Sequence, residues 1–443
     1  MPNYEPVIGL EVHVELNTKT KMFCRCSADY FGKPPNTNTC PICLGLPGAL
    51  PFINEQAINK CIQIGLALNC SINKKSYFER KNYFYPDLPK GYQISQLILP
   101  IAVKGWIEVE DTNGNISKIR INRAHQEEDT GKLTHQGNET LIDFNRSGVP
   151  LVEIVTEPDF TNSSQIKYYA KKLQQIFRYL RVSNADMEKG DMRLEANVSV
   201  RPEGQKELPP YRVELKNINS FRFMVAAVEY EIKRQIESHE KGEKLTQETR
   251  GWNEDKKETY LQRSKEEAHD YRYFPEPDLP ELEIEESRVK SLKSSMPELP
   301  QVKAKRFEQE YGLKRADAVI LSEDIGFSEI FEELVKLGKK EGVDAKTIAN
   351  YIINQKIDLV DTSAQQIVDD IKSKTFGIID DGAELEKVAK EVIDENPDSV
   401  TSYKSGKENA IMALVGGVMR KTAGKANPQK AKEILQRLLL KTE

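Results

Sequence analysis

The residues from Ile8 to Leu16, IGLEVHVEL, alternate strictly between apolar and polar side chains. This alternation predicts a β-strand, because successive side chains of a strand point to opposite faces of its sheet. Two carboxylates and an imidazole, Glu11, His13 and Glu15, then share one face. An antiparallel strand commonly turns its polar face to water, so a solvated row is the simpler interpretation. The alternative is a site to which other strands bring matching groups.

Four further segments with strand-like patterns also carry carboxylates, so that each strand can offer a single acid to one side of a sheet; one of the four ends in three consecutive acids. The acids are Glu127, Glu128 and Asp129 in NRAHQEEDTGK, Glu153 in PLVEIV, Glu195 in DMRLEANVSV and Glu214 in YRVELKN, interleaved with Arg193, Arg212 and Lys216. Carboxylates can hold Mg²⁺, and nearby cations can neutralise charge on a transferred phosphoryl group. Because an imidazole suits Mg²⁺ less well, His13 is expected to bind through water or to favour a manganese-like ion. Solvated strand faces and surface ion pairs are the competing interpretation.

Four of the six cysteines form two close pairs. One residue separates Cys24 from Cys26, two separate Cys40 from Cys43, and thirteen lie between the pairs. In a cytosolic chain this spacing predicts a tetrahedral zinc site. Its role would be structural, because four thiolates leave zinc no open coordination position. Reduced thiols without metal, and less readily a disulfide framework, are the alternatives.

Size and composition limit the function classes. A chain of 443 residues with 38% hydrophobic and 30% charged residues predicts a globular protein of two or three domains. No apolar run approaches the roughly 20 residues of a membrane helix, and no basic-then-apolar segment opens the chain, so a cytoplasmic protein without a membrane partner is expected. The sequence lacks P-loop, Rossmann, hydrolase-elbow and zincin motifs.

The pattern along the chain predicts an α+β fold. A mixed sheet in residues 1–292 is accompanied by helices within 163–182, behind capping candidates at 162–164, and from Phe221 onward. A linker at 294–301 leads into an all-helical domain, 293–370, and a small helical tail, 371–443. Residues 411–443 contain seven Lys or Arg but only two Glu. This excess indicates either a solvated helix face or a nucleic-acid contact.

Longer motifs are recognisable as an ordered set. They are IGLEVHVEL, NTCPICLGLPGALPFIN, RKNYFYPDLPKGYQISQ, RAHQEEDTGK, DFNRSGVPLVEIVTEPD, EANVSVRPEG, VELKNINSF and EEAHDYRYFPEPDLP, followed by LVGGVMRKTAGKANPQKAKEIL in the tail. Together they resemble the B subunit of the tRNA-dependent amidotransferases, the family that makes Gln-tRNA(Gln) or Asn-tRNA(Asn). The resemblance spans nearly the whole chain.

The resemblance implies a carbon–nitrogen ligase that uses glutamine as amido donor. In that family a partner amidase subunit releases ammonia and a third, small subunit completes the heterotrimer. The B subunit uses ATP and Mg²⁺ to phosphorylate the side-chain carboxylate of misacylated Glu-tRNA(Gln) or Asp-tRNA(Asn), and ammonia then displaces phosphate. The rival from another class is a non-catalytic, zinc-stabilised scaffold that binds tRNA. The related archaeal form carries a large inserted domain, for which this chain has no room.

Matching the family's motifs assigns site residues. The metal and kinase site would comprise Glu11, His13, Glu127, Glu153, Glu195 and Glu214, the first four of them catalytic. The family typically has Asp at the position of Glu195, a side chain one methylene shorter. Glu15 is less securely matched and is expected to be a solvated neighbour of the site.

Substrate and tRNA contacts are expected in two places. Near the site they are Lys81, Tyr83, Tyr85, Arg193 and Lys216, and in the tail they are Arg420, Lys421 and Lys425. The segment RKNYFYPDLPKGYQ mixes aromatic and basic residues, which could stack the terminal adenosine of a tRNA and contact its phosphates. Aromatic core packing at a proline-rich turn is the equally simple alternative.

Overall fold

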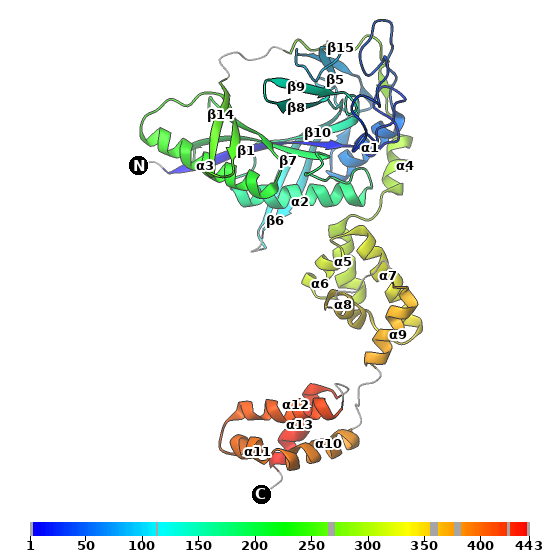
Figure 1. The fold of residues 1–443 in the computed structure, drawn as a ribbon, viewed down its shortest axis with the longest axis vertical. Helices are drawn as coiled ribbons and strands as arrows, with labels where there is room; N and C mark the ends of the chain where they lie inside the picture. Colours follow the sequence, from blue (N-terminus) through cyan, green and yellow to red (C-terminus); the bar gives the residue numbers. More distant parts are fainter. Residues whose placement is uncertain are drawn as a thin grey trace. The chain divides into compact units, whose positions relative to one another are not determined.

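A computed structural model describes residues 3–111, 114–264, 271–354, 362–375, 382–422 and 426–440. The chain forms two compact units, Met1–Pro300 and Gln301–Glu443, and each is described by itself. Strands and helices mix in the first unit, and the described part of the second is helical, which confirms the predicted α+β fold (Figure 1).

The first unit is built on a nine-stranded sheet with the order β14-β13-β12-β11-β1-β10-β7-β6-β2. Neighbouring strands are antiparallel except the parallel pair β12 and β13, so the sheet is mixed. The strands are β1 (Tyr4–Glu15), β2 (Ser71–Ile72), β6 (Ala102–Glu110), β7 (Ile116–Glu128), β10 (Pro150–Thr156), β11 (Met192–Pro202), β12 (Val213–Ile218), β13 (Glu248–Asn253) and β14 (Glu258–Ser264).

The period-two pattern decides which face of this sheet is buried. The apolar rows of β1 and β11 are buried along their whole length: Ile8, Leu10, Val12, Val14 and Leu16, and Met192, Leu194, Ala196, Val198 and Val200. Both predicted strands are therefore confirmed, with the predicted faces. The polar rows consequently share the opposite face.

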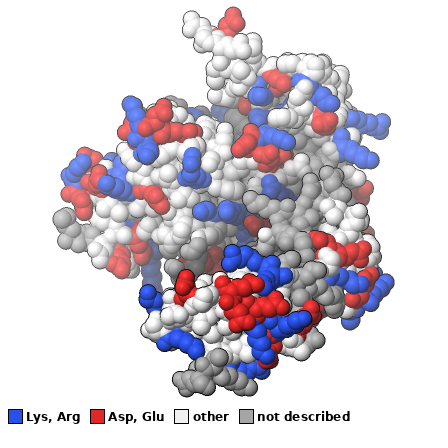
Figure 2. All heavy atoms as spheres, turned by 60° about the horizontal axis from the view of Figure 1, so that its bottom comes forward, with Lys and Arg blue, Asp and Glu red and all other residues white. Residues whose placement is uncertain are grey.

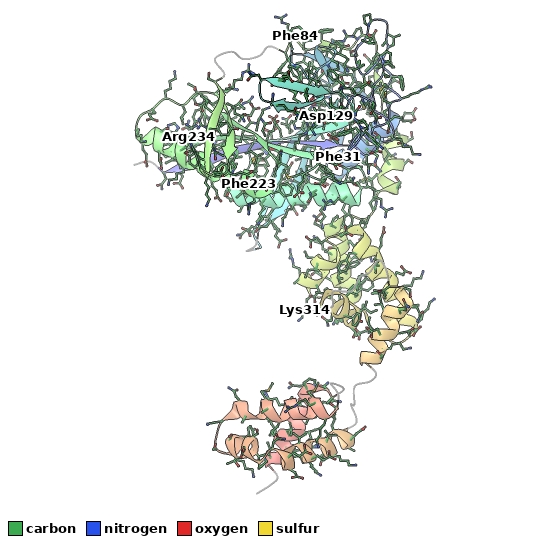
Figure 3. The ribbon with its side chains drawn as sticks, viewed as in Figure 1. Phe31, Phe84, Asp129, Phe223, Arg234 and Lys314 are labelled. Atoms are coloured by element: carbon green, nitrogen blue, oxygen red, sulfur yellow. The ribbon has the colours of Figure 1, made fainter. Side chains whose placement is uncertain are left out.

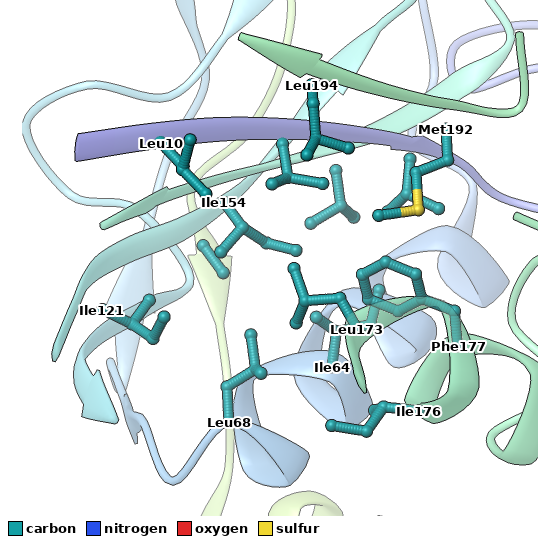
Figure 4. Close-up of a cluster of buried hydrophobic side chains, with 14 of the residues drawn as sticks. Leu10, Ile64, Leu68, Ile121, Ile154, Leu173, Ile176, Phe177, Met192 and Leu194 are labelled. Carbon is teal, nitrogen blue, oxygen red and sulfur yellow. The ribbon is translucent and has the colours of Figure 1, made fainter. Parts of the chain in front are cut away.

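Three helices pack on the apolar face: α1 (Glu55–Ala67), α2 (Ser163–Tyr179) and α3 (Phe221–Glu240) (Figure 1). In the core, Ile154 and Leu194 from the sheet lie above Leu173 and Phe177 of α2 (Figure 4). Helix α2 is the one predicted within 163–182. Asn162 caps it by accepting the backbone N–H of Gln165 at 3.0 Å.

Helix α3 begins where it was predicted but buries a different face. Val225, Val228, Ile232 and Ile236 recur at helical spacing in the sequence and predict an apolar stripe, but only Val228 of these four is fully buried. Glu231 and Gln235 are buried in their place, because the Glu231 carboxylate accepts hydrogen bonds from Arg234 and from Gln235 at 2.6 and 2.8 Å. This polar network is formed partly by distant strands, so helical periodicity alone could not reveal it.

Short strands and loops surround the main sheet. They form the sheets β15-β4-β5, β16-β3 and β8-β9. Their bounds are β3 (Lys75–Ser76), β4 (Glu79–Asn82), β5 (Tyr92–Ser95), β8 (Lys132–Gln136), β9 (Glu139–Asp143), β15 (Phe274–Pro275) and β16 (Leu282–Glu283). The four paired cysteines lie in the irregular segment between β1 and α1.

Short helices follow from residue 286 onward. They are α4 (Glu286–Ser295), α5 (Pro300–Tyr311), α6 (Arg315–Leu321), α7 (Ile325–Lys340), α8 (Ala345–Asn354), α9 (Ala364–Thr375), α10 (Gly382–Glu395), α11 (Pro397–Lys404), the 3₁₀ turn η1 (Glu408–Ala410), α12 (Ile411–Lys421) and α13 (Pro428–Leu440). Two separate hydrophobic clusters support them, one from Ala304 to Ile371 and one from Leu385 to Leu439. The predicted domain boundaries at 292 and 370 stay predictions. Within the described ranges, none of the helices is long and apolar enough to span a membrane.

Candidate functional site

The polar face of the sheet contributes to a cavity of about 210 Å³. Nine side chains predicted from the sequence line it: Glu11, His13, Lys81, Tyr83, Glu127, Glu153, Arg193, Glu195 and Lys216. Gln93, Asp129, Thr130 and Leu151 complete the lining. Strands β1, β4, β5, β7, β10, β11 and β12 thus converge on one cavity, and the polar row of β1 contributes Glu11 and His13 to it.

One group of three ligands lies across strands β1, β7 and β10. His13, Glu127 and Glu153 each offer a ligand atom within 4.8 Å of the others. Strand register explains the meeting, because His13 on β1 and His125 on β7 both pair with Glu153 on β10. His13 Nε2 is 3.6 Å from Glu153 Oε2, and His125 Nε2 is 3.4 Å from the same oxygen. His125 Nε2 also lies 3.2 Å from Glu127 Oε1, so this one imidazole contacts both carboxylates.

A second group lies across β1, β11 and β12. Glu11, Glu195 and Glu214 also bring one carboxylate oxygen each within 4.8 Å of the others. Glu11 pairs directly with Glu195 in the strand register. Lys216 Nζ is 2.7 Å from Glu195 Oε2 and 3.2 Å from Glu214 Oε1. The six predicted metal ligands therefore form two groups of three.

Cations and aromatic rings line the cavity beside these acids. Lys81 Nζ lies 5.9 Å from the ring centre of Tyr83 and 5.3 Å from that of Tyr271. Burial opposes protonation of Lys81, but the charges of Glu127 and neighbouring groups outweigh it and raise its pKa. Arg193 forms an ion pair with Asp129. The lining thus holds permanent cations next to carboxylates, the combination that anionic phosphates require.

Electrostatics in the first group favour ionised carboxylates. Burial disfavours the charge on Glu153, yet His125 and His13 outweigh it and hold its pKa well below the usual range. Burial also opposes protonation of His13, but its hydrogen bond to Glu153 and the charge of that carboxylate raise the pKa of His13 to about 9. Burial raises the pKa of Glu127, while the ammonium of Lys81 lowers it below the ordinary value. The group is preformed in a charged state.

In the second group, burial and like charges oppose the ionisation of Glu11. Burial first, and then the charges of Glu153 and Glu195, raise the pKa of Glu11. A bound cation would relieve this repulsion, and oxygen donors are the ligands that Mg²⁺ prefers. Glu11 is held ready by a hydrogen bond of 3.0 Å from Asn197, and Glu214 by one of 3.0 Å from Thr249. The donor set fits Mg²⁺.

Glu15 corrects one expectation. It is buried rather than solvated, with 6% of its surface exposed. Tyr30 donates to its two carboxylate oxygens at 3.1 and 3.0 Å, and Asp129 shares a hydrogen bond with it. Burial and the charge of Asp129 raise the pKa of Glu15 well above its ordinary value. The prediction failed because Tyr30 and Asp129 come from segments whose proximity to β1 the sequence does not reveal.

The four predicted zinc ligands also meet. The Sγ atoms of Cys24, Cys26, Cys40 and Cys43 all lie within 4.8 Å of one another. The Cys40 backbone N–H donates to Cys43 Sγ at 3.1 Å. The hydrogen bond from Cys24 and the charge of Lys21 outweigh burial and lower the pKa of Cys43 to about 5. Four clustered sulfurs, one of them already favoured as thiolate, fit a tetrahedral zinc ion.

The predicted tRNA contacts are less uniform. Tyr83 lines the cavity, whereas Tyr85 is 56% exposed and its neighbour Phe84, at the outer edge of the first unit, is 93% exposed (Figure 3). Core packing therefore does not account for these two rings. In the tail, Arg420 is exposed, while Lys421 is bound by Glu391 and Glu395 at 3.0 and 2.6 Å. Lys425 lies outside the described residues. On the face in Figure 2, basic and acidic side chains are interspersed.

His125 was not predicted from the sequence, and Asp129 was named among the strand acids but not among the six metal ligands. Both share the strand face of Glu127, since the three lie two residues apart in RAHQEED. The same period that identified Glu127 could therefore have identified them. Ser95 and Gln93, which both donate to Glu127, gave no such signal, because their β5 strand is too short to show alternation.

Comparison with known proteins shows what this chain is similar to. Residues 6–290 match the model of the GatB/GatE catalytic domain, and residues 319–439 match that of the GatB domain. Relatives named as the B subunit of aspartyl/glutamyl-tRNA(Asn/Gln) amidotransferase are similar over the full length. The protein of Carboxydothermus hydrogenoformans is 43% identical over 487 aligned positions, covering 100% of both chains. Those of Thermotoga maritima and Thermodesulfovibrio yellowstonii are 44% and 45% identical, covering 98% of this chain and 99% of each relative.

Proposed function

The chain belongs to the GatB family, and on this premise we propose that its cavity phosphorylates the side-chain carboxylate of a misacylated tRNA with ATP. The chain is one component of a glutamine-dependent, tRNA-dependent amidotransferase, a carbon–nitrogen ligase. Its substrates would be Glu-tRNA(Gln), Asp-tRNA(Asn) or both. Ammonia from the amidase partner would then displace the phosphate.

One observation carries the proposal. Six predicted ligands form two groups of three, five of these ligands line the cavity, and three permanent cations line the same cavity. The lining brings five carboxylates, Glu11, Glu127, Asp129, Glu153 and Glu195, next to the imidazole of His13 and the cations Lys81, Arg193 and Lys216. This arrangement suits a bound divalent metal together with a polyphosphate.

The chemistry follows from the poor leaving ability of a carboxylate oxygen. In the first step a carboxylate oxygen attacks the γ-phosphorus, an O–P bond forms, and the bond from phosphorus to the ADP oxygen breaks. In the second, the ammonia nitrogen attacks the acyl carbon, the C–O bond to phosphate breaks, and the nitrogen gives up one proton. Lys81, Arg193 and Lys216 would screen the repulsion between the two anions of the first step.

Metal ions would be held by the two groups of three. Glu11, Glu195 and Glu214 would bind Mg²⁺, and His13 with Glu127 and Glu153 would bind a second divalent ion directly or through water. When bound, Mg²⁺ supplies charge neutralisation at phosphate oxygens. The four cysteines would hold a structural zinc ion.

The helical tail is proposed to contact the tRNA body. Arg420 is exposed on α12, where a phosphate could reach it, whereas Lys421 must first leave Glu391 and Glu395. Tyr85 and Phe84 offer exposed rings on which an unpaired adenosine could stack. The amidase subunit and the small third subunit complete the proposed assembly.

The test uses the chain assembled with its two partner subunits. Ammonium chloride replaces glutamine, and amide formation on Glu-tRNA(Gln) and Asp-tRNA(Asn) is measured with ATP and Mg²⁺. Wild type should form amide, and His13→Ala or Glu127→Gln should abolish it while tRNA binding persists. The variant Glu207→Gln, at an exposed glutamate, is the control. Amide formation that survives both site substitutions would leave the scaffold function standing.

A further inference from the structure

Lys21 is an unusual buried lysine. Its side chain is fully buried, three residues before the first ligand of the four-cysteine site. Its Nζ donates to the carbonyl oxygens of Asn38 at 2.8 Å and Phe144 at 3.3 Å, and lies 3.7 Å from Cys43 Sγ. The partners of Lys21 Nζ among the described residues are thus two carbonyl oxygens and a sulfur, with no carboxylate among them. A buried ammonium requires an anion, and the thiolate of Cys43 is the one within reach.

The charge balance of the cysteine site calls for such a cation. Four thiolates around Zn²⁺ leave two negative charges in a largely buried position. The positive charge of Lys21 would offset one of these two negative charges. Groups that hydrogen-bond to metal ligands orient those ligands and raise metal affinity, and lysine is well suited to a thiolate because its charge adds to the hydrogen bond.

Lys21 Nζ also contacts a loop that leads to the cavity, through the carbonyl of Phe144. We call residues 142–148, which comprise the end of strand β9 and the residues after it, the stem loop, and residues 34–43 the knuckle loop. Asn36 Nδ2 donates to the Ile142 carbonyl at 2.9 Å, and Asn36 Oδ1 accepts the Phe144 N–H at 2.8 Å. Asn145 Oδ1 accepts the Asn38 N–H at 2.7 Å. The cysteine-bearing knuckle loop therefore holds the stem loop by side-chain hydrogen bonds as well as through Lys21.

The stem loop in turn holds Asp129, a cavity residue. The Gly148 N–H donates to the Asp129 carbonyl and the Asp129 N–H to the Val149 carbonyl, both at 2.8 Å. Arg146 donates to the Thr130 carbonyl at 2.9 Å and pairs with the Asp129 carboxylate at 3.8 Å. Gly148 has φ +88°, and a Cβ there would lie 3.5 Å from both Cys43 and Lys21, so the two loops are in direct packing contact.

We propose that Lys21 is a positioning residue that couples the four-cysteine site to the catalytic cavity, compensating thiolate charge while pinning the stem loop that supports Asp129. The inference rests on the proposed function in assigning that cavity to catalysis. Its two physical consequences, metal affinity and stem-loop stability, do not depend on turnover.

The test compares full-length, zinc-loaded wild type with Lys21→Met, which keeps the aliphatic stem and removes the charge. Lys19→Met, at an exposed lysine nearby, is the matched control. Competition with a chelating dye should give a zinc dissociation constant raised by about 10- to 100-fold for Lys21→Met and unchanged for Lys19→Met. Hydrogen exchange of peptides within 142–149, at saturating zinc, should be faster in Lys21→Met alone. Wild-type zinc affinity, or wild-type exchange with zinc bound, would overturn the proposal.

Two further arms keep the proposal falsifiable if Lys21→Met does not fold. Stripping zinc from wild type should accelerate exchange in 142–149 and leave peptides of α3 unchanged. Asn36→Gly removes the side-chain link at a position with φ 59°, which glycine adopts readily, and should accelerate exchange in 142–149 without changing zinc affinity. Unchanged exchange in either arm would contradict the coupling. If these arms succeed while ATP-dependent amidation fails, the proposed function is at fault, not the coupling.

Discussion

His13 and Glu153 face each other across strands β1 and β10, with His13 Nε2 3.6 Å from Glu153 Oε2. The two residues are 140 positions apart in the sequence, so no local pattern pairs them. The strand register creates the pair. Because the pair lies inside the first ligand group, its protonation and its metal binding are linked.

The first prediction concerns pH in the metal-free protein. The pKa of His13 is raised from 6.5 to about 9, because the hydrogen bond and charge of Glu153 outweigh burial. A raised pKa means that the stabilisation is fully present below pH 6.5 and is lost as pH rises through about 9. The advantage of wild type over His13→Gln in free energy of unfolding should therefore shrink across this window, by on the order of 3 kcal/mol.

Urea unfolding followed by tryptophan fluorescence is the measurement. Both tryptophans, Trp106 and Trp252, lie in the first unit, so the signal reports on that unit alone. His135→Gln is the control, because His135 is exposed on β8. A wild-type advantage that stays constant with pH would refute the assignment.

The second prediction concerns Glu195. Its carboxylate belongs to the second ligand group and is held by Lys216. Glu195→Ala should raise the Mg²⁺ concentration needed for half-maximal amidation by about 10-fold or more, because an oxygen ligand is lost. Glu195→Asp, the residue typical of the family, should retain most of the affinity. An unchanged Mg²⁺ requirement in Glu195→Ala would remove Glu195 from the site.

Much of this site could be predicted from sequence, for a physical reason. Period-two alternation fixes the face of each side chain, so the acids on β1, β10, β11 and β12 could be placed on one face of a sheet. It does not fix the strand order. For that reason the division into two groups, with His13 beside Glu153 and Glu11 beside Glu195, could not be predicted.

Long-range partners account for the other failures. Glu15 is buried by Tyr30 and Asp129. Helix α3 buries the face that carries Glu231, because Glu231 interacts with Arg250 and other distant groups. The role of Lys21 could not be predicted from the sequence either, because its partners are two backbone carbonyl groups and a cysteine sulfur, which no sequence pattern links to it. The spacing of the four cysteines in the sequence correctly predicted that their sulfurs lie close together.

The third prediction concerns metal content. Protein purified without chelator should contain one zinc ion per chain, and Cys40→Ser should lose it and unfold at a lower temperature, because a structural zinc site contributes directly to folding. Cys61→Ala is the control, since Cys61 is buried in the main core outside the cysteine site. Equal zinc content in the two variants would argue against the tetrathiolate site.

The fourth prediction concerns the tail. Arg420→Ala should weaken tRNA binding and reduce the slope of log affinity against log salt by about one phosphate contact. Lys421→Ala should have the smaller effect, because Lys421 already pairs with Glu391 and Glu395. Binding isotherms over a range of salt concentrations measure both. Salt-independent binding by wild type would contradict a phosphate contact in the tail.

The central claim is that the substrate carboxylate itself is phosphorylated. The most direct measurement supplies Glu-tRNA(Gln) or Asp-tRNA(Asn) labelled with ¹⁸O in the side-chain carboxylate, with ATP, Mg²⁺, ammonium and the assembled complex, and analyses the released phosphate by mass spectrometry. The account predicts one ¹⁸O atom in phosphate for each amide formed, and neither product with Glu127→Gln. Unlabelled phosphate released in equal amount to the amide would contradict it.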